Sequence, residues 1–541
     1  MQILVALVNA YVLVMTGSFL AYVALIVVPF LRHRPGPPGQ RADHQWHFMV
    51  PCLDEENVVA ATVRRLLEQF PLSQVWCIDD ASRDATPEIV AALAAIDHRV
   101  HAVTRTFPDA QRGKGPALNA CWRAIVEWLP PGTPPETVIL GVVDADGHLD
   151  PRCLDVISGP EFFANPDVSA VQVAVRVRNQ AGTKPGLDVP RRRLSRLLTT
   201  MQDLEFATVI AAMQFLRRNI GSAGMGGNGQ FTRLSALQLV ADSYDQPWQD
   251  ALIEDFELGL HILLTGGRTE YCHDTWVAQQ GPPTLRRLVR QRSRWGQGVM
   301  QCIRYLRPVM LSPNIQTAAA FEIAYYILLP WFQLVGTLSY VVSLGVLCYA
   351  VAAAPAGVSL LWGAGGLWQL LPLFVLFAVV PLALWGPIYR CRAAPEIGLA
   401  RSLLVGLANV PYSYMHQVAV WWAFLRVVRG RRDWKKTERM EVGAEDLAGL
   451  RRRVAIVPPR RLGAAPVVSG RFRPRPVAPG HVVTARLRVS GGDGAEGGRQ
   501  AAPEAMVGAG GDQLSGAGHH HHPADLAAVG PPPGVRARKE A

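Results

Sequence analysis

The hydrophobic residues of this chain follow two patterns, long apolar runs that flank a middle region and short apolar stretches within it. Residues 3–30 contain no charged side chain and exceed the roughly 20 residues that span a bilayer core. The run begins without positive charge, unlike a secretory signal peptide, and Arg32 and Arg34 follow it. We therefore expect residues 1–34 to be a membrane anchor whose C-terminal end faces the cytosol.

Residues 35–310 show the alternation expected of a soluble α/β domain. The predicted strands lie at 47–51, 75–80, 138–144 and 170–177, and the predicted helices at 56–70, 84–95, 115–128, 192–217 and 251–264. Strands that alternate with helices predict crossover units on a mainly parallel sheet. Because such sheets bind ligands beyond the carboxyl ends of their strands, acidic residues at those ends are candidate site residues.

Residues 311–430 are again predominantly apolar. Their long runs lie at 318–354, 357–389 and 402–427. The middle domain and the basic stretch at 426–439 should both face the cytosol, which requires an even number of crossings between them. Either the first run is a tight hairpin, or one run, such as that containing Pro411 and His416, is interfacial or re-entrant.

Composition sharpens this division. Only 18% of the residues are charged, and the mean hydropathy of +0.14 argues against an ordinary soluble enzyme. The net charge of +11 suits nucleic acid, an anionic membrane face or an anionic substrate, and the membrane runs favour the latter two. Residues 431–541 comprise a basic juxtamembrane segment and a tail with few large apolar side chains. We expect that tail, beyond residue 440, to be disordered.

Acidic residues close two of the predicted strands. Asp79 and Asp80 end the stretch VWCIDD, and Asp144 and Asp146 end VILGVVD in the sequence DAD. Two carboxylates at a sheet rim can share Mg²⁺ or Mn²⁺, which completes its shell with phosphate and water oxygens. An isolated D-x-D would more simply begin a turn. Because acidic strand ends recur here, we predict that Asp144 and Asp146 bind a divalent cation.

A third acidic site, Glu254-Asp255, precedes a helical pattern. Acidic residues stabilise a helix N-terminus through the helix dipole, and the local sequence alone favours this interpretation. The functional interpretation makes Asp255 a general base that accepts a proton from an attacking hydroxyl.

The stretch TLRRLVRQRSRWGQG carries five arginines in a helical pattern. One interpretation is a basic amphipathic helix on anionic headgroups, just before a membrane run. The other is that Gln291 and Arg294 hold a diphosphate while Trp295 offers a flat face to a sugar. Both interpretations can hold at once, because one face of the helix can meet lipid and the other the site.

Two glycine-containing stretches are weaker signals. Lys114 in GKGPALN follows a glycine and precedes a helix, which is consistent with a phosphate or base contact, although the spacing is not that of a P-loop. The stretch GMGGNGQF at 224–231 offers backbone close to a ligand or forms a flexible loop.

These motifs, in this order, resemble family-2 glycosyltransferases. The motifs are Pro51-x-x-Asp54-Glu55-Glu56, Asp79-Asp80, Gly113-Lys114, the DAD of 144–146, Glu254-Asp255 and the QRSRW of 291–295. The pattern is most similar to the membrane-embedded branch with chitin, hyaluronan, cellulose and poly-N-acetylglucosamine synthases. The ending Trp434-x-Lys436-Thr437-x-Arg439 also resembles that branch, so the resemblance covers about residues 1–440.

The resemblance implies a GT-A fold, Rossmann-like with a mainly parallel sheet, inserted between transmembrane helices. It implies donor binding by Asp79, Asp80, Lys114 and Asp144, a metal on Asp146, a base at Asp255 with Glu254 beside it, and diphosphate and acceptor contacts from Gln291, Arg294 and Trp295. The chain departs from the family at Ile253, where threonine is frequent, and at Gln279-Gln280, where an acidic residue is common.

The expected function is inverting, Mn²⁺- or Mg²⁺-dependent transfer of a sugar from a nucleotide-diphosphate donor, UDP-linked, to a growing polysaccharide or glycan at the cytosolic membrane face. The alternative is a single transfer to a polyprenyl-phosphate or glycolipid acceptor. A non-catalytic membrane-anchored binding subunit is more remote, because it requires the acidic pairs to be accidental. The expected partners are the donor, a glycan or lipid-linked acceptor and the bilayer of a multi-pass membrane protein, without nucleic acid. The sequence does not indicate an oligomeric state.

Overall fold

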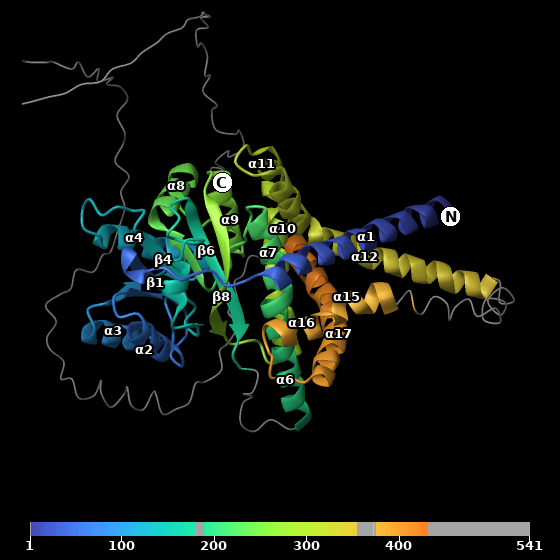
Figure 1. Ribbon diagram of the computed structural model, residues 1–541, viewed down its shortest axis with the longest axis horizontal. Helices are drawn as coiled ribbons and strands as arrows, with labels where there is room; N and C mark the ends of the chain where they lie inside the picture. The colour runs from blue at the N-terminus through green and yellow to red at the C-terminus, as the bar shows by residue number, and fades with distance from the viewer. Residues whose placement is uncertain (1, 180–188, 354–371, 373–374, 431–541) are drawn as a thin grey trace, which may run out of the picture. The chain divides into compact units, whose positions relative to one another are not determined.

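The computed structural model describes residues 2–179, 189–353, 372 and 375–430, all within the compact unit Met1–Arg461 (Figure 1). Three predictions lie outside these residues: the disordered tail beyond 440, the Trp434–Arg439 ending and the first part of the apolar run at 357–389.

A mixed eight-stranded sheet, with the strand order β3-β2-β1-β4-β7-β6-β8-β5, forms the centre of the middle domain. The strands are β1 (Gln45–Cys52), β2 (Gln74–Asp79), β3 (Val100–Thr104), β4 (Val138–Val142), β5 (His148–Leu149), β6 (Val168–Val177), β7 (Gln230–Arg233) and β8 (Arg268–Gln279). Strands β1 to β4 pair in parallel, as do β6 and β8, whereas β7 runs antiparallel to β4 and β6 and β5 antiparallel to β8. The predicted α/β class is confirmed, and the antiparallel strands make the sheet mixed.

Helices cover both faces of the sheet because its central strands bury side chains on both sides. Phe48 of β1 packs with α2 (Val59–Gln69), α3 (Thr86–Ile96) and α5 (Cys153–Ile157), whereas the next residue, Met49, packs on the opposite face. That second face carries α4 (Lys114–Trp128), α8 (Leu234–Tyr244) and α9 (Glu254–Leu264). The predicted helices at 56–70, 84–95, 115–128 and 251–264 are confirmed within a few residues.

A second group of helices lies beside the sheet and packs against the long helices α1 (Gln2–Arg32) and α12 (Thr317–Ala353) (Figure 1). Its members are α6 (Val189–Leu204), the π-helical turn η2 (Glu205–Ile210), α7 (Ala211–Asn219), α10 (Leu285–Gln301) and α17 (Leu399–Val428). Short elements complete the chain: η1 (Arg41–Asp43), η3 (Cys302–Tyr305), α11 (Leu306–Leu311), η4 (Val375–Val379), α15 (Val380–Ala383) and α16 (Trp385–Arg392). Helix α10 packs against both α12 and α17, so it joins the domain to the apolar helices.

Three segments of the described chain are long and apolar enough to cross a membrane, Leu13–Arg32, Thr317–Gly345 and Val375–Arg392. The run at 318–354 is one continuous helix rather than the hairpin that the sequence left open. Helix α17, which holds the third run and includes Pro411 and His416, does not reach that standard of hydropathy and packs along α10 and α16.

Candidate active site

Asp79 and Asp80 lie where the sequence predicts, at the carboxyl end of β2, and both are buried. Asp80 Oδ1 accepts a hydrogen bond from Arg105 Nη1, and the Asp80 backbone N–H donates to Cys52 O at 3.0 Å. Burial raises the pKa of the Asp80 carboxyl, and the nearby Arg105 opposes this. Asp79 Oδ1 accepts from the Ser82 N–H at 3.2 Å and so fixes the turn after the strand.

The loop after β1 is bonded to the loop after β2. The Asp54 N–H donates to Ser82 Oγ at 3.0 Å, and Asp54 Oδ1 accepts from the Arg83 N–H at 2.7 Å. Glu56 Oε2 accepts from the Ala85 N–H at 3.0 Å. These acidic side chains therefore satisfy the backbone of the neighbouring loop and hold the two strand ends in one rigid rim.

Four side chains from three parts of the chain, α4, the loop after β4 and the start of α9, meet beyond the end of β4. Lys114 Nζ, in the first turn of α4, donates to Asp144 Oδ1 at 2.6 Å and also to Gly227 O. A methyl group added at Gly227 would lie 3.1 Å from Asp255 Oδ2 and 3.3 Å from Lys114 Nζ. The structure therefore brings Lys114, Asp144 and Asp255, with Glu254 next to it, around the backbone of Gly227.

Two glycines of the GKG sequence allow this convergence. Gly113 precedes α4 with a φ of +130°, a conformation that disfavours side chains. A methyl group at Gly115 would lie 3.0 Å from Gln249 O and 3.4 Å from Glu254 Cβ. The first turn of α4 thus packs directly against the start of α9, which places Lys114 beside the acidic pair.

The electrostatics of this cluster are unbalanced. Desolvation by burial, followed by repulsion from Asp255, raises the pKa of Glu254 to about 8. Burial also raises the pKa of Asp255, although the Phe256 N–H donates to Asp255 Oδ1 at 2.7 Å. Burial would lower the pKa of Lys114, but Asp144, Glu254 and Asp255 outweigh it, so that its pKa is raised. When all three carboxyls are ionised they exceed the one ammonium by two negative charges, which a divalent cation would neutralise.

The two aspartates of the DAD sequence differ in exposure. The side chain of Asp144 is 23% exposed, whereas Asp146 is fully buried and its Oδ2 accepts from the Gln280 N–H at 3.0 Å. Over the ranges that the structure describes, no group of three His, Cys, Asp or Glu side chains is arranged to hold a metal by itself. The site fits a cation that takes one or two carboxylates from the protein and its other ligands from a diphosphate.

The remaining predicted residues, Gln291, Arg294 and Trp295, share one face of α10. With Gly298 they follow the spacing of three and four residues that places side chains in one stripe. A methyl group at Gly298 would lie 2.8 Å from the Ile253 side chain, and Gln301 Oε1 accepts from the Leu252 N–H at 3.0 Å. This stripe therefore adjoins the residues that lead into Glu254 and Asp255.

Arg292, to which the sequence assigned no role of its own, is the buried arginine of α10. Its guanidinium lies 4.2 Å from the centre of the Trp295 ring, and its Nη2 is 2.6 Å from Glu205 Oε2. The Tyr412 hydroxyl of α17 donates to the same Glu205 oxygen at 2.6 Å. One face of Trp295 is therefore covered, and the expected flat face for a sugar is reduced to the opposite side.

The other arginines of α10 support the expectation of a two-sided helix. Arg286 and Arg290 are exposed, together with Leu285, which is 49% exposed. An exposed mixture of arginine and leucine next to apolar helices is the pattern of a helix on anionic headgroups.

Residues 44–298 match the family model described as glycosyltransferase like family 2. These residues form a family 2 glycosyltransferase domain. The resemblance that the motifs indicate, and the GT-A class that it implies, are thereby confirmed.

The relatives of this glycosyltransferase domain work on different acceptors by name. The chain is 31% identical over 264 residues to a beta-monoglucosyldiacylglycerol synthase of Trichormus variabilis, covering 48% of this chain and 49% of that protein. It is 24% identical over 256 residues to the poly-beta-1,6-N-acetyl-D-glucosamine synthase of Staphylococcus aureus, covering 46% and 53%. The chain thus spans about half the length of the curated relatives that it matches.

Among solved structures, the chain is similar to the mannosyltransferase PcManGT from Pyrobaculum calidifontis in complex with GDP-Man and Mn²⁺. The identity is 17% and the TM-score 0.48, over 79% of this chain and 99% of that chain.

The sequence did not identify the residues whose hydrogen bonds hold the loop beside the candidate site. Asn228 Oδ1 accepts from the Asp144 N–H at 3.2 Å, and Asn228 Nδ2 donates to Gln279 Oε1 at 2.9 Å. Gln172 accepts from the Gly226 N–H at 2.7 Å and donates to Asn228 O at 2.9 Å. The stretch at 224–231 is thus a bonded loop that offers its backbone to the site. The glycine spacing was the available signal, whereas nothing in the sequence connected Gln172 to it.

Proposed function

We propose that the protein is an inverting, membrane-bound glycosyltransferase that uses a nucleotide-diphosphate sugar. The observation that carries this proposal is the convergence of Lys114, Asp144, Glu254 and Asp255 around Gly227, within a family 2 glycosyltransferase domain. The acidic pair could accept a proton, and the carboxylates suit a cation that would itself bind a diphosphate.

The donor would lie along the rim of the sheet. Strand β1 separates β2 from β4, so the acidic ends of these two strands are about 10 Å apart. This spacing suits a UDP group whose nucleoside contacts Asp79 and Asp80 while its diphosphate reaches Lys114 and Asp144. The nucleobase and the phosphates would then occupy separate places on one rigid rim.

A divalent cation fits beside Lys114, with Asp144 as the more exposed ligand and Asp146 joining once the Gln280 segment moves. Mn²⁺ or Mg²⁺ bound there would supply positive charge next to the leaving diphosphate. Lys114 and Arg294 would contribute fixed positive charge to the same end of the donor. Preorganised charge of this kind stabilises a leaving group without reorganisation during the reaction.

Asp255 is proposed as the base. It would accept the proton of the attacking hydroxyl as the new bond to the anomeric carbon forms and the bond to the diphosphate oxygen breaks. Attack opposite the leaving diphosphate inverts the anomeric configuration. The raised pKa of the Glu254–Asp255 pair supports this role, because a general base is most effective when its pKa lies near the working pH.

The acceptor would approach the uncovered face of Trp295, beside the start of α9. Two acceptor classes are consistent with the relatives' names, a diacylglycerol glycolipid and a growing polysaccharide. The higher identity to the glycolipid synthases favours a lipid acceptor, and the match to the poly-beta-1,6-N-acetyl-D-glucosamine synthase keeps polymer formation as the second candidate.

We further propose that Leu13–Arg32, Thr317–Gly345 and Val375–Arg392 cross the bilayer and that α17 lies at the interface. Two crossings would then separate the domain from the basic stretch after α17, which satisfies the requirement for an even number. The packing of α17 along α10, a helix of the domain itself, supports an interfacial position. The domain would face the cytosol, as the arginines after the first span indicate.

The test is transfer by the full chain in nanodiscs, supplied with a panel of radiolabelled nucleotide sugars and with either diacylglycerol or oligosaccharide acceptors. Products would be separated by lipid extraction and by size, with Asp255→Asn as the inactive control. A labelled glycolipid would establish the first candidate, and a labelled polymer the second. Absence of transfer from every donor, by protein that is folded and inserted, would refute the proposal.

A further inference from the structure

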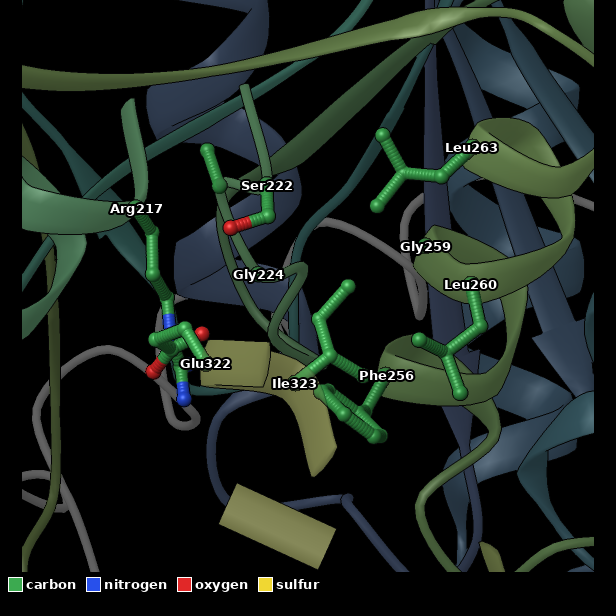
Figure 2. A pocket seen from close by; sticks show the side chains of 10 residues that line it. Arg217, Ser222, Gly224, Phe256, Gly259, Leu260, Leu263, Glu322 and Ile323 are labelled. Atoms are coloured by element: carbon green, nitrogen blue, oxygen red, sulfur yellow. The ribbon is translucent and has the colours of Figure 1, made fainter. Parts of the chain in front are cut away.

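A small cavity lies behind the candidate active site, between α7, α9 and the first turns of α12 (Figure 2). Its walls include Arg217, Ser222, Phe256, Leu260 and Glu322, and it leaves room for a water-sized molecule. We call it the Arg217–Glu322 cavity. Phe256 directly follows the proposed base Asp255, and Gly259 lies one turn after it, so the cavity lies beside the same helix turn as that base.

The charged residues of this cavity join three segments that are distant in sequence. Arg217 Nε is 2.8 Å from Glu322 Oε1, and the Tyr22 hydroxyl of α1 donates to the same oxygen at 3.1 Å. The Arg217 guanidinium also lies 4.4 Å from the centre of the Tyr326 ring. Glu322 belongs to the candidate span Thr317–Gly345, where a charged residue is costly unless it is paired and usually has a function.

Three polar atoms of the cavity have no hydrogen-bond partner in the described part of the chain: Arg217 Nη2, Ser222 Oγ and Glu322 Oε2. Their residues are 6%, 3% and 7% exposed, so bulk water does not satisfy them. Buried polar atoms in folded proteins nearly always have a partner, which is a protein group or an ordered water. One guanidinium donor, one carboxylate acceptor and one hydroxyl are complementary to the donors and acceptors of a water molecule.

We propose that Arg217, Ser222 and Glu322 hold one ordered water molecule. The water would accept from Arg217 Nη2, donate to Glu322 Oε2 and use its remaining capacity for Ser222 Oγ. Three hydrogen bonds are the usual number for a buried water. Bound there, the water completes the Arg217–Glu322 ion pair and connects it to the loop that begins at Ser222.

That loop leads directly to the catalytic cluster. The Ser222 N–H donates to Arg217 O at 2.7 Å, and Gln214 bonds both backbone groups of Gly224, at 2.7 and 2.8 Å. Three residues later, Gly227 O accepts the hydrogen bond from Lys114. The water site therefore positions the loop that holds Lys114, a consequence that rests on the proposed transfer function, whereas the site itself does not.

The first test is an experimental density map of the full chain in nanodiscs, at a resolution that shows ordered water. We expect density within hydrogen-bonding distance of Arg217 Nη2, Ser222 Oγ and Glu322 Oε2. A cavity without density, or three side chains that bond directly to one another, would overturn the proposal. This test needs no turnover, so its failure is distinct from failure of the proposed activity.

The second test compares Ser222→Ala with Ser222→Val by the midpoint of thermal unfolding. Alanine removes one partner of the water, whereas valine fills its place and leaves Arg217 and Glu322 each short of a partner. We therefore expect valine to lower the midpoint more than alanine does. If the cavity holds no water, valine would fill it and give a higher unfolding midpoint than alanine. That order of midpoints would contradict the proposal. The same substitutions at Ser243, which is exposed on α8, are the matched controls.

A kinetic measurement tests the link to the site. Ser222→Val should raise the donor KM about 3–10-fold, the effect of losing about one hydrogen bond, with a smaller change in kcat. If a variant lacks the water density but keeps the parental donor KM, then the water does not influence Lys114. That result would refute the positioning role.

Discussion

Two charged clusters of this protein each combine one basic side chain with carboxylates, but in different proportions. Around Gly227, Lys114 faces the three carboxylates of Asp144, Glu254 and Asp255. Beside Trp295, Arg292 faces the single carboxylate of Glu205, to which Tyr412 adds a hydroxyl. The first cluster has an excess of negative charge, and the second is balanced.

The difference separates a site that must bind charge from one that holds helices together. A balanced, buried pair is complete within the protein, and the Glu205 cluster joins η2, α10 and α17. Desolvation and mutual repulsion of the carboxylates raise the pKa values of Glu254 and Asp255. A divalent cation would offset that repulsion and could in turn bind a diphosphate.

The largest effect should come from removing the cation. Chelation with EDTA should reduce transfer to background, and Mn²⁺ or Mg²⁺ should restore it, as measured by labelled product. Asp146→Ala should not be rescued by added metal if this carboxylate joins the site during turnover. The unfolding midpoint should also fall in the chelator, because a cation that binds only the folded protein stabilises it. Full turnover in EDTA would show that the cluster around Gly227 needs no cation, which would contradict the proposed difference between the two clusters.

The next effect concerns the base. Asp255→Asn keeps the size of the side chain and removes its ability to accept a proton, so the transfer rate should fall about 10²–10⁴-fold. Donor affinity, measured by titration, should change little because Lys114 and Asp144 remain. Asp242→Asn, at an exposed position on α8, is the matched control. A parental rate would leave Asp255 as a helix-start residue and turn attention to Glu254.

The pH dependence should follow the raised pKa values. Burial raises the pKa of Glu254 to about 8 and also that of Asp255, so the pair holds a proton that a base must first lose. The transfer rate should therefore increase with pH toward about 8 and fall about tenfold per pH unit on the acid side. Raising the Mn²⁺ concentration from a limiting to a saturating level should move this limb to lower pH, since a nearby cation favours the ionised carboxylates. A transfer rate that falls only below about pH 4 would contradict the raised pKa values of this cluster.

Gly227→Ala tests the close approach in that cluster. The added methyl group would lie 3.1 Å from Asp255 Oδ2 and 3.3 Å from Lys114 Nζ, so these side chains must separate. We expect about a tenfold loss of kcat/KM, the effect of about 1.4 kcal/mol, with a normal unfolding midpoint. Gly398→Ala is the control, because a methyl group there contacts nothing within 4 Å. Equal activity of both variants would place the reacting groups elsewhere.

The smallest effect on rate should come from the balanced cluster. Arg292→Lys keeps the charge but loses the planar group that covers Trp295, so stability should fall by about 1–3 kcal/mol. The acceptor KM should rise about threefold, while hydrolysis of the donor by water stays constant. Arg290→Lys, at an exposed position on the same helix, should change neither quantity. A loss of donor hydrolysis in Arg292→Lys would assign this arginine to the reacting site.

The sequence predicted the elements whose apolar patterns are simple. Strand β2 ends at Asp79 as expected, and Lys114 begins a helix, because buried parallel strands and amphipathic helices leave regular patterns. Strand β8 was missed, since Thr269, Glu270 and Thr275 are buried along it and interrupt the apolar alternation. Buried polar residues depend on partners from elsewhere in the fold, and a local pattern does not contain them.

The same limit applies to the site. The acidic residues could be named from their positions after strands, but their meeting with Lys114 depends on the approach of α4 to α9 at Gly115. Nothing in the sequence distinguishes Arg292 from the other arginines of α10. Only the packing of η2 and α17 shows that it is buried beneath Trp295, whereas Arg290 is exposed.

The length of α12 has a consequence for the proposed crossing of the bilayer. Its 37 residues correspond to about 55 Å of helix, against a hydrocarbon core about 30 Å thick. A helix with such a surplus responds to bilayer thickness by tilting or by changing how far it protrudes. Since Glu322 lies near the domain end of this helix, lipids with longer or shorter acyl chains would shift the attachment point of the loop that holds Lys114. Acyl-chain length would in this way become a variable that the glycosyltransferase domain senses.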